Sequence, residues 1–429
     1  MMPSARAGAG RELLARLGPG LVTGASDDDP SGIATYSQVG AQFGLSMLWT
    51  MFFSLPLMIA IQEICARLGR ITGVGIAESL TRHYPRPLAL ALTSLLCLAN
   101  VFNLGADICA MAATTRLVAG GFASVYAVLF GVLSVALQVY VPYRIYVRYL
   151  KWLTLVLFAY VAAAFVVHVP WKEALRATLM PRLSLNPDYF MALVAVLGTT
   201  ISPYLFFWQT SQEAEDLKVH ETESSLRRRP SQALAQFRRI SVDTRVGMAF
   251  SNVVAFFIIL VTGVTLHTAG GNAGIHTAAD AARALQPLAG PLAFFLFAIG
   301  IIGTGMLAVP VLAGAAAYAI AETFRWPASL ESKPQQAPQF YGVLALSVGI
   351  GVSLNFVGLD PIRALFWSAV LNGIVAVPLM YVLMRMSANR VIVGQFTLPL
   401  YLRLFGWAAT AIMFVVSLVF LLSALHLRN

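Results

Sequence analysis

The sequence from residue 21 to residue 35 reads LVTGASDDDPSGIAT. Three adjacent carboxylates, Asp27–Asp29, interrupt a run that otherwise consists of apolar and small residues. At membrane depth each of these charges would cost about 3 kcal/mol unless it is satisfied or protonated. Pro30 removes a backbone donor, and Gly32 permits unusual backbone angles. The pattern predicts a membrane helix that is unwound near its centre, where free carbonyls lie beside carboxylates.

The same carboxylates can be interpreted as the solvated cap of a helix that starts later. That interpretation leaves about 14 residues before Gly44, fewer than the roughly 20 that a membrane-spanning helix needs. We therefore predict a broken span over residues 18–43. Carboxylates and carbonyls together are the ligands that a hard divalent cation prefers.

The composition indicates a protein with many membrane spans. Of the 429 residues, 58% are hydrophobic and 11% are charged, whereas a typical soluble domain is about 25% charged. This difference excludes an ordinary soluble enzyme. Eleven apolar segments are candidates to cross the roughly 30 Å of hydrocarbon: residues 18–43, 46–66, 88–118, 122–141, 148–169, 188–216, 246–266, 290–322, 339–356, 363–385 and 401–426.

The basic residues indicate how the spans are oriented. With the amino terminus in the cytoplasm, 22 of the 29 Lys and Arg residues fall on the cytoplasmic side and seven fall outside. Cytoplasmic loops carry such an excess, so we predict that the amino terminus is inside and the carboxyl terminus outside. The net charge of +10 fits this topology and attraction to anionic membrane lipid, and no nucleic-acid partner is expected.

Two further patterns exclude common kinds of site. Cys65, Cys97 and Cys109 lie in apolar runs or at their ends and form no CxxC pair, so neither a disulfide framework nor a zinc site is expected. No GxxxxGKS or GxxxxGKT motif occurs in the sequence, so ATP is not expected to drive the protein directly.

A second break is predicted in the sixth span, where residues 198–203 read GTTISP. Two discontinuous helices in matching positions of two five-helix halves are typical of transporters built from an inverted repeat, with a binding site at the midplane. The predicted division is a cytoplasmic segment, a first repeat, an outer loop, a second repeat that includes an Arg-rich cytoplasmic loop at 217–245, and an additional helix 11. These parts are residues 1–17, 18–169, 170–187, 188–385 and 401–426.

Several motifs, in order along the chain, resemble the NRAMP family of divalent-metal transporters. They are Gly18-Pro19-Gly20, Asp29-Pro30-Ser31-Gly32-Ile33-Ala34-Thr35 and Gly40-Ala41-Gln42-Phe43-Gly44 around span one; Gln62, Ala66-Arg67-Leu68-Gly69, Thr72-Gly73 and Ala77-Glu78 in and after span two; and Gly198 through Pro203 in span six. The resemblance implies an all-α polytopic membrane protein with a LeuT-like fold. Ten helices would form two inverted five-helix repeats, with helices 1 and 6 broken at the midplane and an eleventh helix appended.

The resemblance also implies a function. It is that of a secondary transporter that imports divalent metal cations by alternating access. Such a protein is not an enzyme and has no cofactor, because the metal ion is the transported substrate. Its partners are the cation and membrane lipid, and no obligate protein partner is expected. The similarity to bacterial members implies the bacterial cytoplasmic (inner) membrane as its location.

The sequence departs from the family pattern at positions that select the ion. The family's Asp-Pro-Gly-Asn is Asp29-Pro30-Ser31-Gly32 here, and its Met-Pro-His-Asn is Ser202-Pro203-Tyr204-Leu205. Soft sulfur ligands favour transition metals, whereas oxygen ligands suit magnesium, calcium and manganese. The missing methionine is similar to the NRAMP-related magnesium or manganese branch and favours a hard ion.

Other departures concern proton coupling, which in the family depends on a helix-six histidine and on helix-three carboxylates. The histidine of the helix-six motif is Tyr204, and a further histidine one turn on is Gln209. The acidic pair on helix three is displaced, with Asn103 and then Asp107. The resemblance therefore does not extend to the groups that couple transport to protons.

The first candidate ligands are Asp29, the hydroxyl of Ser202, and the backbone carbonyl of Thr199, which matches the family's carbonyl ligand. Asp28 is the candidate second carboxylate. In a helix its side chain would point about 100° away from that of Asp29, so it either joins the site through local unwinding or supports it. Asp27 is expected behind the ligands or along the access path. Further candidate ligands or lining residues are Ser31, Gly32, Tyr204, Gln209, Asn103, Asp107 and Asn372.

Two polar stripes extend from the candidate site. One lies on a single face of span three and either lines the ion path or joins helices: Asn100, Asn103 and Asp107. The other runs from the break in span six toward the cytoplasm and is either an inner vestibule or a set of interfacial charges: Gln209, Glu213 and Asp216.

Two other functions fit parts of the sequence. A sodium- or proton-coupled symporter for organic solutes such as amino acids would use the same fold, but three aspartates beside the site argue against binding a substrate carboxylate. An intramembrane aspartyl hydrolase would use Asp29 and Asp107 as its two carboxylates. The hydrolase hypothesis assigns no purpose to the two broken helices.

Overall fold

The computed structural model describes residues 19–141, 145, 153–184, 186–219, 224–267, 275 and 277–426. Within these ranges all regular structure is helical, as predicted. The predicted cytoplasmic segment, residues 1–17, lies outside them. So do seven basic residues of the topology argument, which are Arg6, Arg11 and Arg16 of that segment together with Arg144, Arg148, Lys151 and Arg428.

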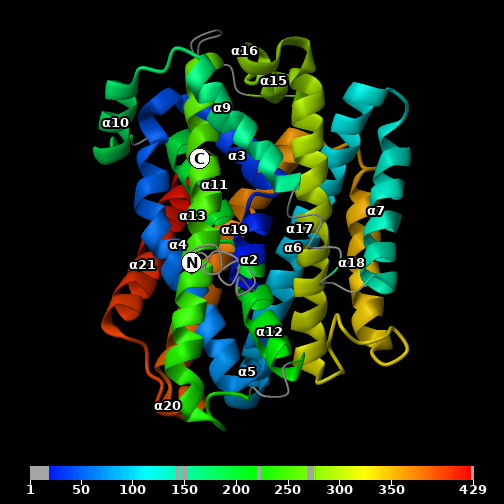
Figure 1. Ribbon diagram of the computed structural model, residues 1–429, viewed down its shortest axis with the longest axis vertical. Helices are drawn as coiled ribbons and strands as arrows, with labels where there is room; N and C mark the ends of the chain where they lie inside the picture. The colour runs from blue at the N-terminus through cyan, green and yellow to red at the C-terminus, as the bar shows by residue number, and fades with distance from the viewer. Residues whose placement is uncertain are drawn as a thin grey trace, which may run out of the picture.

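Each predicted span has a helical counterpart (Figure 1). The first span is broken into α2 (Pro19–Asp27) and α3 (Pro30–Phe43), and the sixth into α11 (Pro187–Thr200) and α12 (Pro203–Val219). With α11 and α12 taken together, the described part of the chain holds eight helices long and apolar enough to cross a membrane. The other seven are α4 (Trp49–Thr72), α6 (Arg86–Ala119), α7 (Ala123–Tyr140), α13 (Ala233–Thr265), α17 (Ala293–Phe324), α19 (Pro361–Ala388) and α21 (Leu400–His426).

Two spans are shorter within the described ranges, and short helices lie at both ends of the molecule. The first residues of the predicted fifth span, 148–152, lie outside those ranges, and the rest of it holds η2 (Leu153–Leu157) followed by α9 (Phe158–Val166). The ninth span is α18 (Pro338–Leu354). In Figure 1 the upper end carries α10 (Trp171–Leu179), α15 (Ala278–Arg283) and α16 (Gln286–Ala289), and the lower end carries α5 (Ile76–His83) and α20 (Arg390–Val393). The predicted outer loop 170–187 therefore contains a helix, α10.

The seventh span begins earlier than predicted. We expected it at 246–266, after an Arg-rich loop at 217–245, but α13 begins at Ala233. A hydropathy window excludes this first part because it contains Arg238 and Arg239. The helix continues through it because Arg239 forms an ion pair of 2.5 Å with Glu213 of α12.

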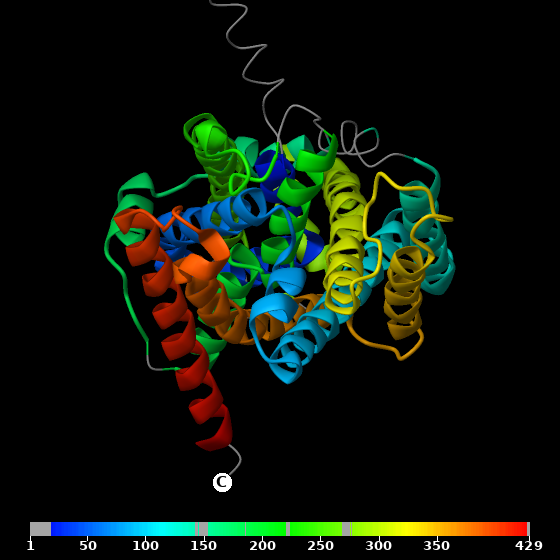
Figure 2. The ribbon, with the colours of Figure 1, turned by 90° about the horizontal axis from the view of Figure 1, so that it is seen from below.

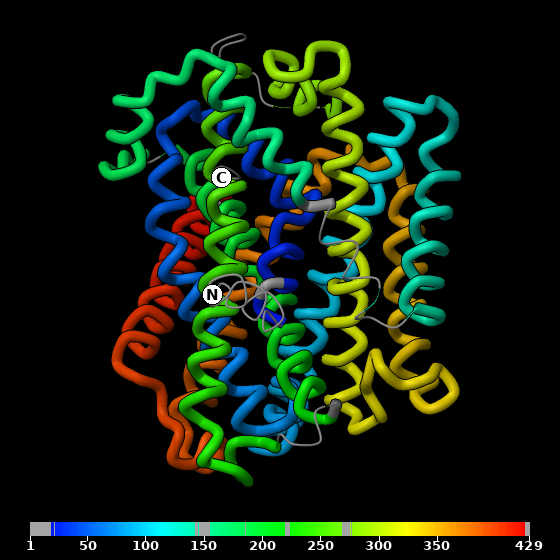
Figure 3. The backbone as a smooth tube through the Cα atoms, in the orientation of Figure 1, coloured from blue at the N-terminus to red at the C-terminus, as the bar shows by residue number. Residues whose placement is uncertain are grey.

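The broken first span lies in the interior. Its blue trace runs through the middle of the molecule in Figure 3, while α7 with α18 and, opposite them, α21 form the two edges in Figures 1 and 2. The side chains of Asp27, Asp28 and Asp29 are each at most 2% exposed. The unwound segment is therefore closed off from solvent on both sides.

Glycines let α13 approach both halves of the broken span. A Cβ built on Gly24 would lie 2.3 Å from the backbone carbonyl of Gly247, and one built on Gly40 would lie 2.5 Å from the carbonyl of Ile259. Small residues permit such backbone-to-backbone packing between membrane helices. This packing fixes α2 and α3 against one continuous helix although the chain between them is unwound.

Substitution of Gly24 by alanine is expected to destabilise the protein. The added methyl group meets backbone atoms, which cannot rotate away, so we expect a loss of about 3 kcal/mol, at the upper end for overpacking. Thermal unfolding of purified protein measures it. The matched control is Gly342→Ala in α18, where a Cβ would meet nothing within 4 Å. An equal loss in both variants would contradict this account of the α2–α13 contact.

Candidate metal site

Both predicted helix breaks are present. Helix α2 ends at Asp27, and α3 begins at Pro30 with Asp29 as its N-cap in an extended conformation (φ −69°, ψ 169°). Helix α11 ends at Thr200, its C-cap Ile201 has φ −122° and ψ 58°, and α12 begins at Pro203. Proline at the first helical position, where the missing N–H is not needed, explains where both second halves start.

Asp29 is held by three hydrogen bonds. Its Oδ1 accepts from the backbone N–H of Gly32 and from the hydroxyl of Ser31, both at 2.7 Å, and its Oδ2 accepts from the Asn103 amide of α6 at 3.0 Å. Ser31 and Gly32 thus orient the carboxylate. Oδ1 already accepts two hydrogen bonds, whereas Oδ2 accepts one and keeps a further lone pair that could reach a cation.

Asp27 and Asp28 are hydrogen-bonded to a different residue, Ser251. The hydroxyl of Ser251, on α13, is 2.8 Å from Asp27 Oδ2 and 3.0 Å from Asp28 Oδ1. The other oxygen of each carboxylate has no hydrogen-bond partner in the described part of the chain. Asp28 therefore shares the Ser251 hydroxyl with Asp27, and Ser251 was not among the residues predicted for the site.

At the second break two oxygens lie side by side. The Ser202 hydroxyl is 2.7 Å from the carbonyl oxygen of Thr199 and 2.8 Å from that of Gly198. Neighbouring ligands of an octahedral Mg²⁺ at 2.0–2.1 Å are about 2.9 Å apart. The spacing of the Ser202 and Thr199 oxygens is thus compatible with one shared ion.

Bonds across the centre join the two broken spans. The Tyr204 hydroxyl donates to the carbonyl of Ser26, at 2.9 Å, and the Thr23 hydroxyl donates to the Gln209 side chain. Tyr204 thus satisfies one of the free carbonyls at the end of α2. Both bonds connect α2 to α12, the two half-helices below the breaks in Figure 1.

Several predicted lining residues carry unpaired polar atoms although they are at most 1% exposed. Within the described ranges, no hydrogen bond reaches either oxygen of Asp107, the Asn103 oxygen, the Gln209 nitrogen or either polar atom of Asn372. Asp107 lies near Asp29 and the backbone of Ser31. Buried polar groups almost always have partners, so this concentration points to water or an ion in the working protein.

Acidic side chains alone do not supply enough ligands for a metal ion at the breaks. No group of three or more His, Cys, Asp or Glu side chains placed to hold a metal ion occurs among the residues that the structure describes. A cation at the breaks would need carbonyl and hydroxyl oxygens as well. That donor set is typical of hard ions such as Mg²⁺ and Ca²⁺.

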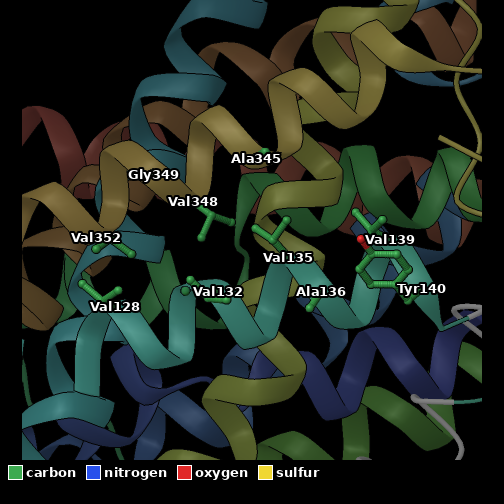
Figure 4. Close-up of a pocket in the computed structure, with 11 residues that line it drawn as sticks. Val128, Val132, Val135, Ala136, Val139, Tyr140, Ala345, Val348, Gly349 and Val352 are labelled. Atoms are coloured by element: carbon green, nitrogen blue, oxygen red, sulfur yellow. The ribbon is translucent and has the colours of Figure 1, made fainter. Parts of the chain in front are cut away.

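An apolar cavity lies away from the two helix breaks. It measures about 430 Å³ and opens between α7 and α18 (Figure 4). Its wall consists of valine, alanine and glycine residues with one tyrosine, Tyr140. Without a charged group it offers no site for a cation.

Below the breaks an ionic network joins three helices. Arg70 of α4 lies 2.9 Å from Asp216 and 3.7 Å from Glu213, both on α12, and Glu213 also pairs with Arg239 of α13. Glu213 is fully buried. Glu213 is therefore enclosed between two arginines rather than solvated. Asp216, with a fifth of its side chain exposed, lies at the edge of the network.

A second set of bonds joins α12 to α17, and we call it the inner latch. The Ser211 hydroxyl donates to Glu322 at 2.7 Å, and one turn further on the Tyr318 hydroxyl donates to Glu215. Glu322 also occupies the space beside Gly75, where any Cβ would collide with its carboxylate. The latch therefore lies beside Gly75, the N-cap of α5.

The sequence matches a family model over nearly its whole length. The family is Nramp, described as natural resistance-associated macrophage protein-like, and the match covers residues 20–423. Two similar relatives are each named "Divalent metal cation transporter MntH". That of Klebsiella pneumoniae (strain 342) is 27% identical over 420 residues, covering 94% of this chain and 92% of the relative. That of Acidiphilium cryptum (strain JF-5) is 26% identical over 392 residues, covering 90% and 84%.

Solved structures show the same fold. A manganese transporter of Eremococcus coleocola, in complex with an aromatic bis-isothiourea substituted compound, has a TM-score of 0.75 at 17% identity, with 98% of this chain and 88% of that chain covered. MhsT in complex with L-phenylalanine has a TM-score of 0.62 at 13% identity, with 95% and 98% covered. Both similarities concern the fold alone, and they confirm the predicted LeuT-like arrangement.

The family match agrees with the broken helices, the apolar spans and the buried polar centre described above. Members of the family are transporters rather than enzymes, and they use no cofactor because the metal ion is the substrate. The chain is therefore an integral membrane transporter, and it belongs to the Nramp family of divalent metal transporters.

Proposed function

We propose that this transporter imports hard divalent cations such as Mg²⁺ or Mn²⁺ by alternating access, without obligatory proton coupling. The observation that carries this proposal is the donor set at the two breaks. The candidate ligands are carboxylate, carbonyl and hydroxyl oxygens, with no sulfur or imidazole among them. Oxygen ligands suit magnesium, calcium and manganese.

In this proposal the ion lies between Asp29 on one side and the Thr199 carbonyl with the Ser202 hydroxyl on the other. Asn103 orients Asp29. Asp28 becomes a ligand only if its unpaired Oδ2 turns toward the ion, while Oδ1 can stay bonded to Ser251. Asp27 supports it. The unpaired atoms of Asp107, Gln209 and Asn372 would bind water that the ion retains, as Mg²⁺ commonly does.

The proposal includes a topology. The amino terminus lies in the cytoplasm and the carboxyl terminus outside, in a bacterial inner membrane, with repeats at 18–169 and 188–385 and helix 11 at 401–426. The excess of basic residues on one side supports this orientation. The end that carries α5 and the inner latch is then the cytoplasmic end.

Alternating access requires that contacts below the breaks separate when the site opens to the cytoplasm. The inner latch is a set of such contacts, because it joins α12 to α17 through a few hydrogen bonds. In the closed arrangement described here the latch is formed. Weakening it should favour the state open to the cytoplasm.

Tyr318→Phe tests this role. The change removes the hydroxyl that donates to Glu215 and accepts from the backbone N–H of Leu330 at 3.2 Å. A net hydrogen bond contributes about 1 kcal/mol, so we expect an open population about fivefold larger. The measurement is the maleimide labelling rate of an introduced Ala214→Cys, a buried α12 position, with Cys65, Cys97 and Cys109 replaced by alanine.

The matched control is Tyr341→Phe. The Tyr341 hydroxyl donates to the carbonyl of Ser332 at 2.8 Å, within the same loop region, and among the described residues it has no hydrogen bond to α12. Equal labelling rates in the two tyrosine variants would show that the latch does not control opening.

The proposed function is tested by flux into liposomes that contain ion-sensitive dyes and a pH dye. We expect uptake of Mg²⁺ and Mn²⁺ without internal acidification, and little Cd²⁺ uptake. Strong Cd²⁺ selectivity with acidification would contradict the ligand argument. In that case a Met111→Leu variant would identify the source of the sulfur, because the Met111 thioether lies with Pro30 beside Gly305. Loss of Cd²⁺ uptake in this variant would show that the thioether is a ligand. Absence of any metal flux would favour the organic-solute symporter.

A further inference from the structure

A cavity of about 190 Å³ lies where α19, α20 and α21 meet, at the end of the molecule that carries α5. Its wall is formed by Met384 and Ala388 of α19, Arg390 of α20, Thr397 and Leu398 of the connecting segment, and Arg403 and Trp407 of α21. Two arginines, one threonine and one tryptophan therefore line a common space. We call it the arginine cavity.

Neither arginine of this cavity is compensated by an acidic residue. In the described part of the chain, the side chains of Arg390 and Arg403 form no ion pair and no hydrogen bond, and no carboxylate lines the cavity. From residue 361 to residue 429 the sequence contains five arginines and no Asp or Glu. The Glu63 carboxylate reaches α21 only at Tyr401, and it is also bonded to Arg67. The cavity thus presents an unbalanced positive charge.

The surroundings are those of a membrane boundary. Trp407 packs edge-on against Tyr381, with ring centroids 5.8 Å apart, and such aromatic residues gather at the level of lipid headgroups. Leu400 and Leu404, on the α21 turns next to Arg403, are each 60% exposed. An apolar surface therefore continues from the mouth of the cavity along a membrane-spanning helix.

We propose that the arginine cavity binds the phosphate group of an anionic phospholipid, whose acyl chains lie along α21. Arginine pairs with phosphate oxygens through its planar fork of donors, and Thr397 supplies a hydroxyl. A volume of 190 Å³ equals about six water molecules at roughly 30 Å³ each, enough for a phosphate diester. The charge selects an anion, and the adjoining apolar surface favours a lipid over a soluble phosphate.

The consequence is a lipid that holds α21 against α20. Because the two arginines come from α20 and α21, a shared phosphate connects these elements across the 394–399 segment. Bound lipid should therefore raise the thermal unfolding midpoint of the protein. This inference does not depend on which cation is transported.

The test compares phosphatidylglycerol with phosphatidylcholine, measured by native mass spectrometry and by thermal unfolding of the full chain in detergent. We expect wild type to bind phosphatidylglycerol preferentially. In the double variant R390Q/R403Q binding should weaken about 25-fold, because each arginine near the surface is worth about a fivefold effect. The control, R228Q/R238Q, removes two exposed cytoplasmic-end arginines that do not line the cavity.

Each outcome decides the proposal. Unchanged unfolding midpoints in phosphatidylcholine, with binding of phosphatidylglycerol lost only in R390Q/R403Q, support the site. Equal losses in both double variants would show that diffuse charge attracts the lipid and would overturn it. Displacement of the lipid by millimolar inorganic phosphate would identify a soluble-anion site instead and would also overturn the lipid assignment.

Discussion

Replacement of Asp29 by asparagine should reduce metal flux at least about 100-fold. The reason is electrostatic, because the asparagine oxygen can still accept from Gly32 N–H and cap α3, while the negative charge is lost. Even residues that only orient a metal ligand cost 10–100-fold when they are changed, so loss of a charged ligand should cost more. The measurement is Mg²⁺ and Mn²⁺ uptake into liposomes.

Two comparisons separate this effect from misfolding. Asp188→Asn removes an exposed carboxylate at the start of α11 and should leave uptake unchanged. The thermal unfolding midpoint of Asp29→Asn should lie close to that of wild type because the cap is preserved. Full uptake by the folded Asp29→Asn variant would exclude this carboxylate as a ligand.

The second large effect is expected from Ser202→Met. The serine hydroxyl lies 2.7 Å from the Thr199 carbonyl, so a methionine there would bring a thioether to the second break. Sulfur ligands favour soft metals, and we expect the ratio of Cd²⁺ to Mg²⁺ uptake to rise at least about tenfold. The ratio is measured in the same liposome assay.

The matched variant is Ser202→Leu, which has a similar volume and no sulfur. It should lose uptake of both metals, because the hydroxyl is gone and nothing replaces it. A rise of the Cd²⁺ ratio in both variants would assign the effect to the shape of the site. The thioether would then have no part in metal selection.

The breaks were predictable because their causes are local. Asp29-Pro30-Ser31-Gly32 combines an N-cap residue, a proline suited to the first helical turn and nearby donors, and all three features act within four residues. The rival interpretation of the carboxylates as a helix cap was correct for Asp29 in one respect. The residue does cap α3, but it is buried in the interior rather than solvated.

Long-range partners could not be predicted in the same way. The direction of Asp28 depends on how far the chain turns across the break and on which face of α13 approaches it, and Ser251 lies more than 220 positions away. The only signal was a polar pair, Ser251-Asn252, inside an otherwise apolar span. The burial of Glu213 could not be predicted for the same reason, since its partner Arg70 lies on another helix.

The most direct measurement is the position of a bound ion. Crystals grown with Mn²⁺ and measured near the manganese absorption edge would reveal it by anomalous scattering. Our account predicts one peak between the Asp29 carboxylate, the Thr199 carbonyl and the Ser202 hydroxyl, at about 2.0–2.6 Å from each oxygen. A peak held by Asp27, Asp28 and Ser251 alone, without contact to Asp29 or Ser202, would contradict the account.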